Sequence, residues 1–134
     1  MFSSVSDVCD RTAVAAALDA QPRVDVMVCA AGIYNDARFL ELDEARFRQM
    51  LEVNVVGTFI PAQEAARRMQ AGARIVTISS RGALGGTRFA HYVASKAAVI
   101  GLTRAMAMEL RDKRIAVNSV APGFTDTPMT RSAP

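Results

Sequence analysis

The sequence predicts an α/β fold, in which helices cover a parallel sheet. Short apolar segments alternate with longer helical ones along the chain, which is typical of strand–helix–strand units. The apolar segments are nearly continuous, as in strands that are buried on both faces of a parallel sheet. Small or polar residues follow three of these segments, and ligands bind beyond the carboxyl ends of such strands. The length of 134 residues and the 51% of hydrophobic residues fit one globular domain.

The expected elements alternate in order. Residues 2–8 predict the end of a strand and a turn at Asp7, and further strands are predicted at 24–29, 74–79 and 115–120. Helices are predicted at 11–20, 43–71 and 90–110, from alanine-rich sequence and apolar residues at helical spacing. Pro61 is expected to kink or tighten the long middle helix. Right-handed crossovers would join the strands into one parallel sheet.

Composition argues against several other classes of protein. The net charge is only +3, and the densest basic residues lie near predicted helix ends, where cations offset the helix dipole, so no nucleic-acid partner is expected. Cys9 and Cys29 form no Cys-x-x-Cys pair, so no metal site is expected. No apolar stretch is long enough to span a membrane, and the N-terminus lacks a signal-peptide pattern. These features favour a reduced, cytoplasmic setting.

Tyr92 and Lys96 carry the strongest chemical signal. They lie four residues apart at the start of a predicted helix, which places both side chains on one helix face. A free tyrosine is a poor acid–base group at neutral pH, but a neighbouring cation favours its phenolate form. Alone, this spacing also fits an ordinary pair of surface residues, so its meaning depends on the residues around it.

Those surroundings supply an ordered set of motifs. The motifs are Cys-Ala-Ala-Gly at 29–32, Asn-Val-Val-Gly at 54–57, Ile-Ser-Ser at 78–80, Tyr92-x-x-x-Lys96 and Pro122-Gly123-x-x-x-Thr127. Their order and spacing resemble the signature of the short-chain dehydrogenase/reductase family, over residues 6–129. The resemblance implies a single, partial Rossmann-like domain over residues 1–134, with a doubly wound parallel sheet and three layers, α/β/α. It also implies an NAD or NADP cofactor and hydride transfer to or from a small carbonyl or secondary alcohol substrate.

The resemblance further implies a role for each motif residue. Tyr92 would be the general acid–base, Lys96 would hold the nicotinamide ribose, and Asn54 would anchor a water that leads to the lysine. Ser80 is the substrate-binding serine when counted from the strand, and Ser79 when counted back from Tyr92. Ser80 is preferred, because pairing fixes a strand's register whereas loops absorb deletions. The remaining cofactor contacts implied are Asp7 and Val8 beside the adenine, Ala30, Ala31 and Gly32 at its ribose, and Pro122, Gly123 and Thr127 at the nicotinamide carboxamide.

The chain departs from the family pattern in four ways. No Gly-x-x-x-Gly-x-Gly loop, which holds the pyrophosphate in the family, precedes residue 7, and the glycines at 82, 85 and 86 have the wrong spacing. The strand end that separates NAD from NADP is also missing, so the cofactor preference cannot be read. Cys29 stands where the family usually has asparagine. The family's substrate lid, which would follow Thr127, is also missing. The substrate therefore cannot be read, because its specificity is expected to depend largely on that lid and on loops such as 33–41 and 82–90.

Three interpretations therefore remain open. The chain represents an incomplete oxidoreductase, a non-catalytic partner of a complete relative, or a gene fragment without function. The long helices 43–71 and 90–110 resemble those that form the family's subunit interface, so a folded chain is expected to be a homo-oligomer. His91, next to Tyr92, is expected to line the edge of the pocket rather than to act as a base.

Overall fold

The computed structural model describes residues 5–131. Its sheet contains strands β1 (Val26–Cys29), β2 (Arg74–Ile78) and β3 (Ala116–Val120), in the order β1-β2-β3. All pairs are parallel, and Val28 pairs with Val76 and Val76 with Asn118. The α/β class and the parallel sheet that the sequence predicts are therefore confirmed.

The first predicted strand is not found among the described residues. Its residues 2–4 lie outside the described range, and 5–7 have no regular structure. A strand needs a hydrogen-bonding neighbour, and none of the described strands lies beside this segment. Asp7 instead forms a turn, in which its Oδ1 accepts a hydrogen bond from Cys9 N (2.8 Å) and its carbonyl oxygen accepts one from Asp10 N (3.1 Å).

The helices lie close to their predicted positions. They are α1 (Arg11–Asp19), α2 (Glu44–Leu51), α3 (Gly57–Arg68), α4 (Ala90–Glu109) and the short α5 (Pro128–Arg131). Side-chain oxygens of Asp10 and Asp43 cap α1 and α2. Two 3₁₀ turns, Phe39–Glu41 and Arg81–Leu84, lie in the loops.

The predicted helix 43–71 is interrupted before Pro61 rather than at it. A π-helical turn at Glu52–Val56 joins α2 to α3, and Asn54 lies within it, fully buried. Pro61 has no N–H to donate to the carbonyl oxygen of Gly57, four residues earlier, so regular bonding is already weakened there. Such single π turns often occur at functional sites.

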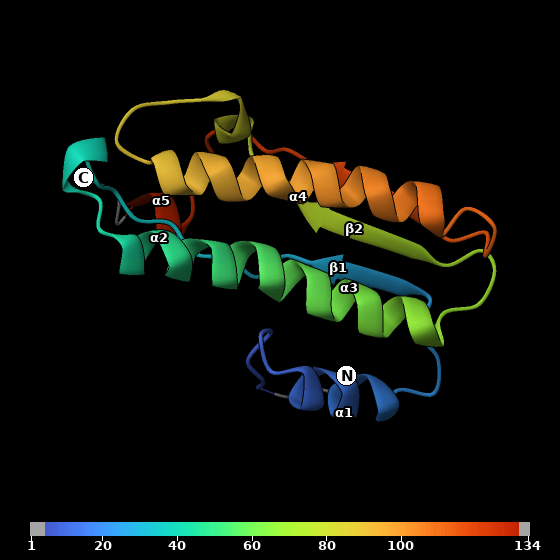
Figure 1. The fold of residues 1–134 in the computed structure, drawn as a ribbon. Helices are drawn as coiled ribbons and strands as arrows, with labels where there is room; N and C mark the ends of the chain where they lie inside the picture. The colour runs from blue at the N-terminus through green and yellow to red at the C-terminus, as the bar shows by residue number, and fades with distance from the viewer. Residues whose placement is uncertain (1–4, 132–134) are drawn as a thin grey trace.

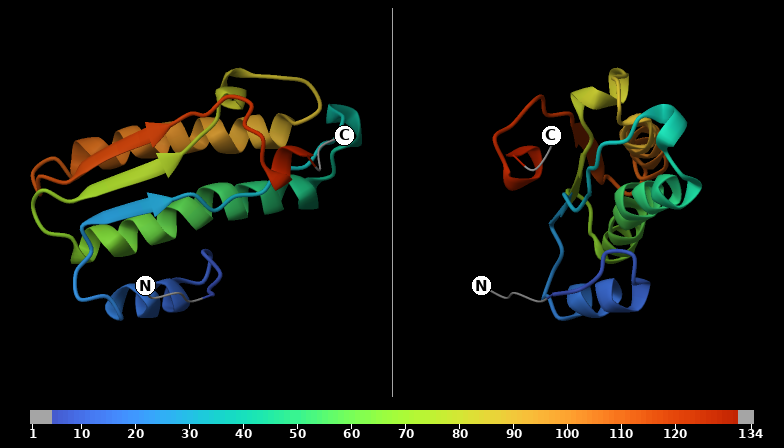
Figure 2. Two further views of the ribbon diagram at one scale, coloured as in Figure 1. Left: turned by 180° about the vertical axis from the view of Figure 1, so that it is seen from behind. Right: turned by 90° about the vertical axis from the view of Figure 1, so that its left-hand side faces the viewer.

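One layer of helices covers the sheet. Figure 1 shows α3 and α4 side by side against the strands, with α1 beyond α3, and the reverse view in Figure 2 shows the strands without a helix across them. Ile75, Thr77 and Val117 face the helices and are buried, whereas Val26 and Val28 on the other face are 59% and 54% exposed. The described residues thus supply one of the two helical layers of an α/β/α arrangement.

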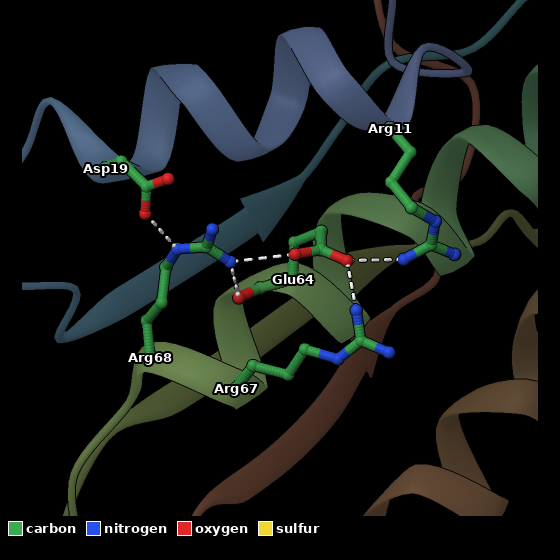
Figure 3. Close-up of polar contacts among 5 residues, drawn as sticks. All are labelled: Arg11, Asp19, Glu64, Arg67 and Arg68. Atoms are coloured by element: carbon green, nitrogen blue, oxygen red, sulfur yellow. Dashed lines mark hydrogen bonds and ion pairs between the residues drawn. The ribbon is translucent and has the colours of Figure 1, made fainter.

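A buried carboxylate joins α1 to α3. The side chain of Glu64 is only 5% exposed, and it contacts Arg11 of α1, Arg67 (2.5 Å) and Arg68 (2.8 Å), as Figure 3 shows. Arg68 also contacts Asp19 of α1 at 2.7 Å. Hydrogen bonds from Arg68 and then Arg11 hold the pKa of Glu64 below its ordinary value. The ionised form of Glu64 therefore stabilises the contact between the two helices.

We expect this contact to make the stability of the chain dependent on pH in the acidic range. Because the folded chain lowers the pKa of Glu64, the contribution of the ionised carboxylate to stability is present at neutral pH and is lost as the pH falls through that lowered pKa. Thermal unfolding should show a lower Tm for Glu64→Gln than for the wild type at pH 7, and a smaller difference at acidic pH. Glu44→Gln is the matched control, since Glu44 pairs with Arg48 while 76% exposed. Equal Tm values of Glu64→Gln and the wild type at pH 7 would contradict this assignment.

Candidate active site

The carboxyl ends of the three strands meet at one edge of the sheet, beside the start of α4. A pocket of about 580 Å³ opens there, and Ser80, Tyr92, Pro122 and Gly123 line it together. The remaining lining residues are Tyr34, Arg81, Gly82, Leu84, Gly85, Phe89, Phe124 and Met129. Four of the residues singled out in the sequence therefore share one cavity, although they come from three separate segments.

Lys96 lies beneath Tyr92 in the first turns of α4. Its ammonium is 5.7 Å from the centroid of the Tyr92 ring, and it donates a hydrogen bond to the carbonyl oxygen of Ile78 (2.9 Å) at the end of β2. Lys96 is only 6% exposed, and this burial lowers its pKa. An ammonium has three N–H donors, so the bond to Ile78 leaves capacity for a ligand.

The two adjacent serines differ in their surroundings. Ser79 is buried, and its hydroxyl donates to the carbonyl oxygen of Lys96 (2.8 Å), which ties β2 to α4. Ser80 is half-buried and lines the pocket, and its Oγ accepts a hydrogen bond from Gly82 N (2.9 Å). Since successive side chains of an extended segment point in opposite directions, only one of the pair faces the pocket.

Asn54 connects the loop after β1 to the start of α4. Its Oδ1 accepts a hydrogen bond from Ile33 N (2.8 Å), and its Nδ2 donates to Ile33 O and to Ser95 Oγ, both at 3.0 Å. Ser95 in turn donates to the carbonyl oxygen of Tyr92 (2.8 Å). A Cβ on Gly32 would lie 3.1 Å from Asn54 Oδ1, so glycine allows this close approach. Asn54 does not line the pocket; it holds the segments that do.

The residues expected at the adenine end lie outside the pocket. Ala30 and Ala31 are exposed just after β1, and Asp7 and Val8 form the turn before α1. Val8 packs on Gly57, where a Cβ would lie 2.7 Å from Val8 Cγ2.

Cys29, which stands where the family usually has asparagine, is the last residue of β1. Thr127, which is expected at the nicotinamide carboxamide, lies directly before α5. Burial raises the pKa of Cys29 to about 11, so its thiol is neutral. Thr127 is half-buried before α5, and its carbonyl oxygen accepts a hydrogen bond from Arg131 N (3.0 Å).

His91 does not take its expected place at the pocket edge. It is fully buried, and its Nε2 lies 2.5 Å from Asn35 Oδ1. On a helix, adjacent residues point about 100° apart, so Tyr92 and His91 face different surroundings. Two aromatic residues that the sequence did not single out, Tyr34 and Phe89, line the pocket instead. They lie in the two loops expected to contact the substrate, but the packing of their rings had no signal in the sequence.

Residues 5–131 contain neither a membrane-spanning helix nor a metal-binding cluster of side chains. No helix there is long and apolar enough to cross a membrane. The same residues contain no cluster of three or more histidine, cysteine or acidic side chains that could hold a metal ion.

Comparison with known proteins identifies the family. The sequence model of the short chain dehydrogenases matches residues 4–134. The 3-oxoacyl-[acyl-carrier-protein] reductase MabA of Mycobacterium tuberculosis is 40% identical, over 98% of this chain and 56% of its own length. The acetoacetyl-CoA reductase of an Acinetobacter species is 42% identical, over 87% of this chain and 48% of its own. The chain belongs to the short-chain dehydrogenase/reductase family.

Solved structures agree with this assignment. A short chain dehydrogenase from Burkholderia cenocepacia, solved in complex with NADP, superposes with a TM-score of 0.86 at 36% identity, covering 92% of this chain and 53% of that protein. The Rossmann-like fold expected from the sequence is thereby confirmed. The chain spans about half the length of the relatives that it matches.

Proposed function

We propose that the chain is the catalytic half of an NAD(P)-dependent oxidoreductase, which transfers a hydride between the nicotinamide and a carbonyl or secondary alcohol carbon. The observation that carries this proposal is the shared pocket, which Ser80 and Tyr92 line from different segments while Lys96 is buried beside Tyr92. Family membership supports the oxidoreductase class.

Each of these residues has a distinct part in the proposed reaction. Tyr92 gives a proton to the carbonyl oxygen during reduction, or takes it from the hydroxyl during oxidation. Ser80 donates a hydrogen bond to the same substrate oxygen and stabilises the charge that develops on it. Lys96 would hold the nicotinamide ribose and places its positive charge near Tyr92. Asn54 acts through the loop and helix that it connects, as a positioning residue.

The residues present fit one end of a dinucleotide. Tyr92, Lys96, Pro122 and Gly123 would hold the nicotinamide end, and a Cβ on Gly123 would crowd Arg81 Cδ at 3.3 Å, so glycine keeps this side of the pocket open. The cofactor would supply or accept the hydride. Thr127 is proposed beside Pro122 and Gly123 at the nicotinamide carboxamide, as the sequence predicts. The proposed adenine-side contacts are also those expected from the sequence: Asp7, Val8, Ala30, Ala31 and Gly32. The printed sequence contains no glycine-rich pyrophosphate loop, so the pyrophosphate has no proposed partner in it.

An activity assay on the whole gene product tests the proposal. The coding DNA upstream of Met1 would be read in frame, and the longest reading frame that contains this chain would be expressed beside the 134-residue chain. Loss of NADH or NADPH absorbance would be followed with acetoacetyl-CoA and with simple ketones. We expect turnover by a product that includes the glycine-rich loop. No turnover by such a product with any carbonyl substrate or with either cofactor would refute the proposal.

A groove between α3 and α4 supports self-association through the two long helices. It has a volume of about 300 Å³ and is lined mainly by apolar side chains, among them Phe59, Leu102 and Met106. We expect the chain to form dimers in solution, and Ala105→Glu, which places a charge at the groove, to make it monomeric in sedimentation experiments. Ala16→Glu, at an exposed alanine of α1 away from the groove, should remain dimeric. A monomeric wild-type chain would contradict the proposed interface.

A further inference from the structure

Three aromatic rings meet at the pocket. The ring of Tyr34 lies edge-on to that of Tyr92, with centroids 5.1 Å apart and an interplanar angle of 85°. The ring of Phe89 lies 6.0 Å from Tyr34 and 6.3 Å from Tyr92. All three distances are within the range of favourable aromatic pairs. The proposed proton donor is thus one member of an aromatic cluster, and all three members line the pocket.

The loop that carries Tyr34 is fixed to the segment that carries Phe89. Ala37 N donates to Arg88 O at 2.7 Å, and an ion pair joins Asp36 to Arg88 at 2.7 Å. On the other side of Tyr34, both backbone polar atoms of Ile33 bond to Asn54. These contacts hold the two rings in place before any ligand binds, which lowers the entropy cost of recognition.

The glycines of the loop 82–86 allow it to lie directly against the rings. A Cβ on Gly86 would lie 2.2 Å from Phe89 Cζ, and a Cβ on Gly82 would lie 3.4 Å from Tyr92 Cε1. Neither glycine has the spacing of a cofactor-binding loop. Their small size instead brings the loop against the aromatic cluster, close to Ser80.

The rest of the pocket is mostly apolar. Leu84 and Phe124 line it while 89% and 91% exposed, so a bound apolar group would remove their surfaces from water. Arg81 is the charged lining residue, and no carboxylate lines the pocket in the described part of the chain. The apolar lining therefore favours an apolar group beside the reacting carbonyl, and the positive charge of Arg81 disfavours a cationic group there.

We propose that Tyr34 and Phe89 are specificity-determining residues, and that they select a carbonyl substrate with a planar aryl group next to the carbonyl. This inference rests on the proposed function, because it places the carbonyl at Ser80 and Tyr92. An aryl ketone is conjugated, so its ring and carbonyl share a plane, and packing of the ring on Tyr34 and Phe89 also orients the carbonyl. A flexible alkyl ketone gains less from the rings and loses more rotational freedom on binding.

Binding of two small ketones tests the inference without any cofactor. The chain contains two tyrosines, Tyr34 and Tyr92, and no tryptophan, so the NMR ring signals of ¹³C-labelled tyrosine report on this pocket alone. The probes are acetophenone and 2-octanone, which have the same numbers of carbon and oxygen atoms. We expect acetophenone to shift the signals of both tyrosines and to bind about fivefold more tightly than 2-octanone. Equal or tighter binding of 2-octanone would overturn the inference.

Substitutions of Tyr34 and Phe89 test whether these two rings cause the preference for acetophenone. Tyr34→Leu and Phe89→Leu should each weaken acetophenone binding by about two- to tenfold, the equivalent of one aromatic pair, and should leave 2-octanone binding unchanged. Tyr34→Phe keeps the ring and should keep the preference, and its missing signal assigns the spectrum. Phe39→Leu, at a phenylalanine that is 75% exposed and does not line the pocket, is the matched control. If Tyr34→Leu does not fold, Phe89→Leu decides, and an unchanged preference in the folded variants would overturn the inference.

Failure of this inference differs from failure of the proposed function. A whole gene product that reduces alkyl ketones at least as well as aryl ketones would contradict the aryl selectivity only. A chain that prefers acetophenone, within a gene product that transfers no hydride, would contradict the proposed function only.

Discussion

Tyr92→Phe is expected to abolish turnover by the whole gene product while leaving cofactor binding intact. Loss of a general acid–base group lowers rates by about 10²- to 10⁴-fold, and a phenylalanine has no proton to transfer. The change should appear in kcat measured by NADH or NADPH consumption. The affinity for the cofactor, measured by its fluorescence on binding, should change little, since Lys96 and Gly123 remain.

The Tyr92→Phe variant removes the hydroxyl group but keeps the packing of the ring. The phenylalanine keeps the ring that contacts Tyr34 and Phe89, so thermal unfolding should occur at nearly the wild-type temperature. A fall in kcat with an unchanged Tm would therefore report the lost hydroxyl. Turnover close to that of the wild type would show that another group moves the proton, and the role given to Tyr92 would be wrong.

Alanine substitutions of the two adjacent serines should affect different properties, one mainly turnover and the other mainly stability. Ser80→Ala removes the hydroxyl that lines the pocket, and loss of one donor to a developing oxyanion lowers kcat by about 10²- to 10³-fold. Ser79→Ala removes the buried hydrogen bond to Lys96 O, which should reduce the free energy of unfolding by about 1–2 kcal/mol. Its effect on kcat should be far smaller than that of Ser80→Ala.

Steady-state kinetics and thermal unfolding of both variants check this prediction. The two measurements should rank the variants in opposite order, with Ser80→Ala worse in turnover and Ser79→Ala worse in stability. The reverse ranking in turnover would move the substrate oxygen to Ser79. It would also mean that the loop between β2 and α4 rearranges when ligands bind, because Ser79 is buried against α4 in this structure.

The sequence by itself determined the parts of the molecule that local patterns encode. The apolar segments that became β1, β2 and β3 and the helical spacing of α1 and α4 were predicted to within a few residues. The spacing of Tyr92 and Lys96 also followed from the sequence, because residues four apart share a helix face. The family resemblance was confirmed, since it depended on the order of motifs along nearly the whole chain.

Only the tertiary structure decided features that depend on distant partners. The segment before α1 looked like a strand, but a strand needs a neighbour, and a local sequence does not say whether one exists. The interruption of the long helix lies at Glu52–Val56, where Asn54 bonds to Ile33 and Ser95, and both partners are far from it in sequence. The environments of Ser79 and Ser80 also depend on packing: Ser79 is buried, whereas Ser80, which the sequence analysis preferred, lines the pocket.

The same reason explains why Tyr34 and Phe89 were missed. They are 55 residues apart, and their rings meet only because the loop 33–37 is bonded to the start of α4. Periodicity and motif spacing describe neighbours along the chain, whereas a pocket is made by neighbours in space. In this protein, the sequence determined that Tyr92 and Lys96 lie on one helix face, because their spacing is local. The packing of the loops around α4 decided which other side chains line the pocket with Tyr92, because those side chains are neighbours only in space.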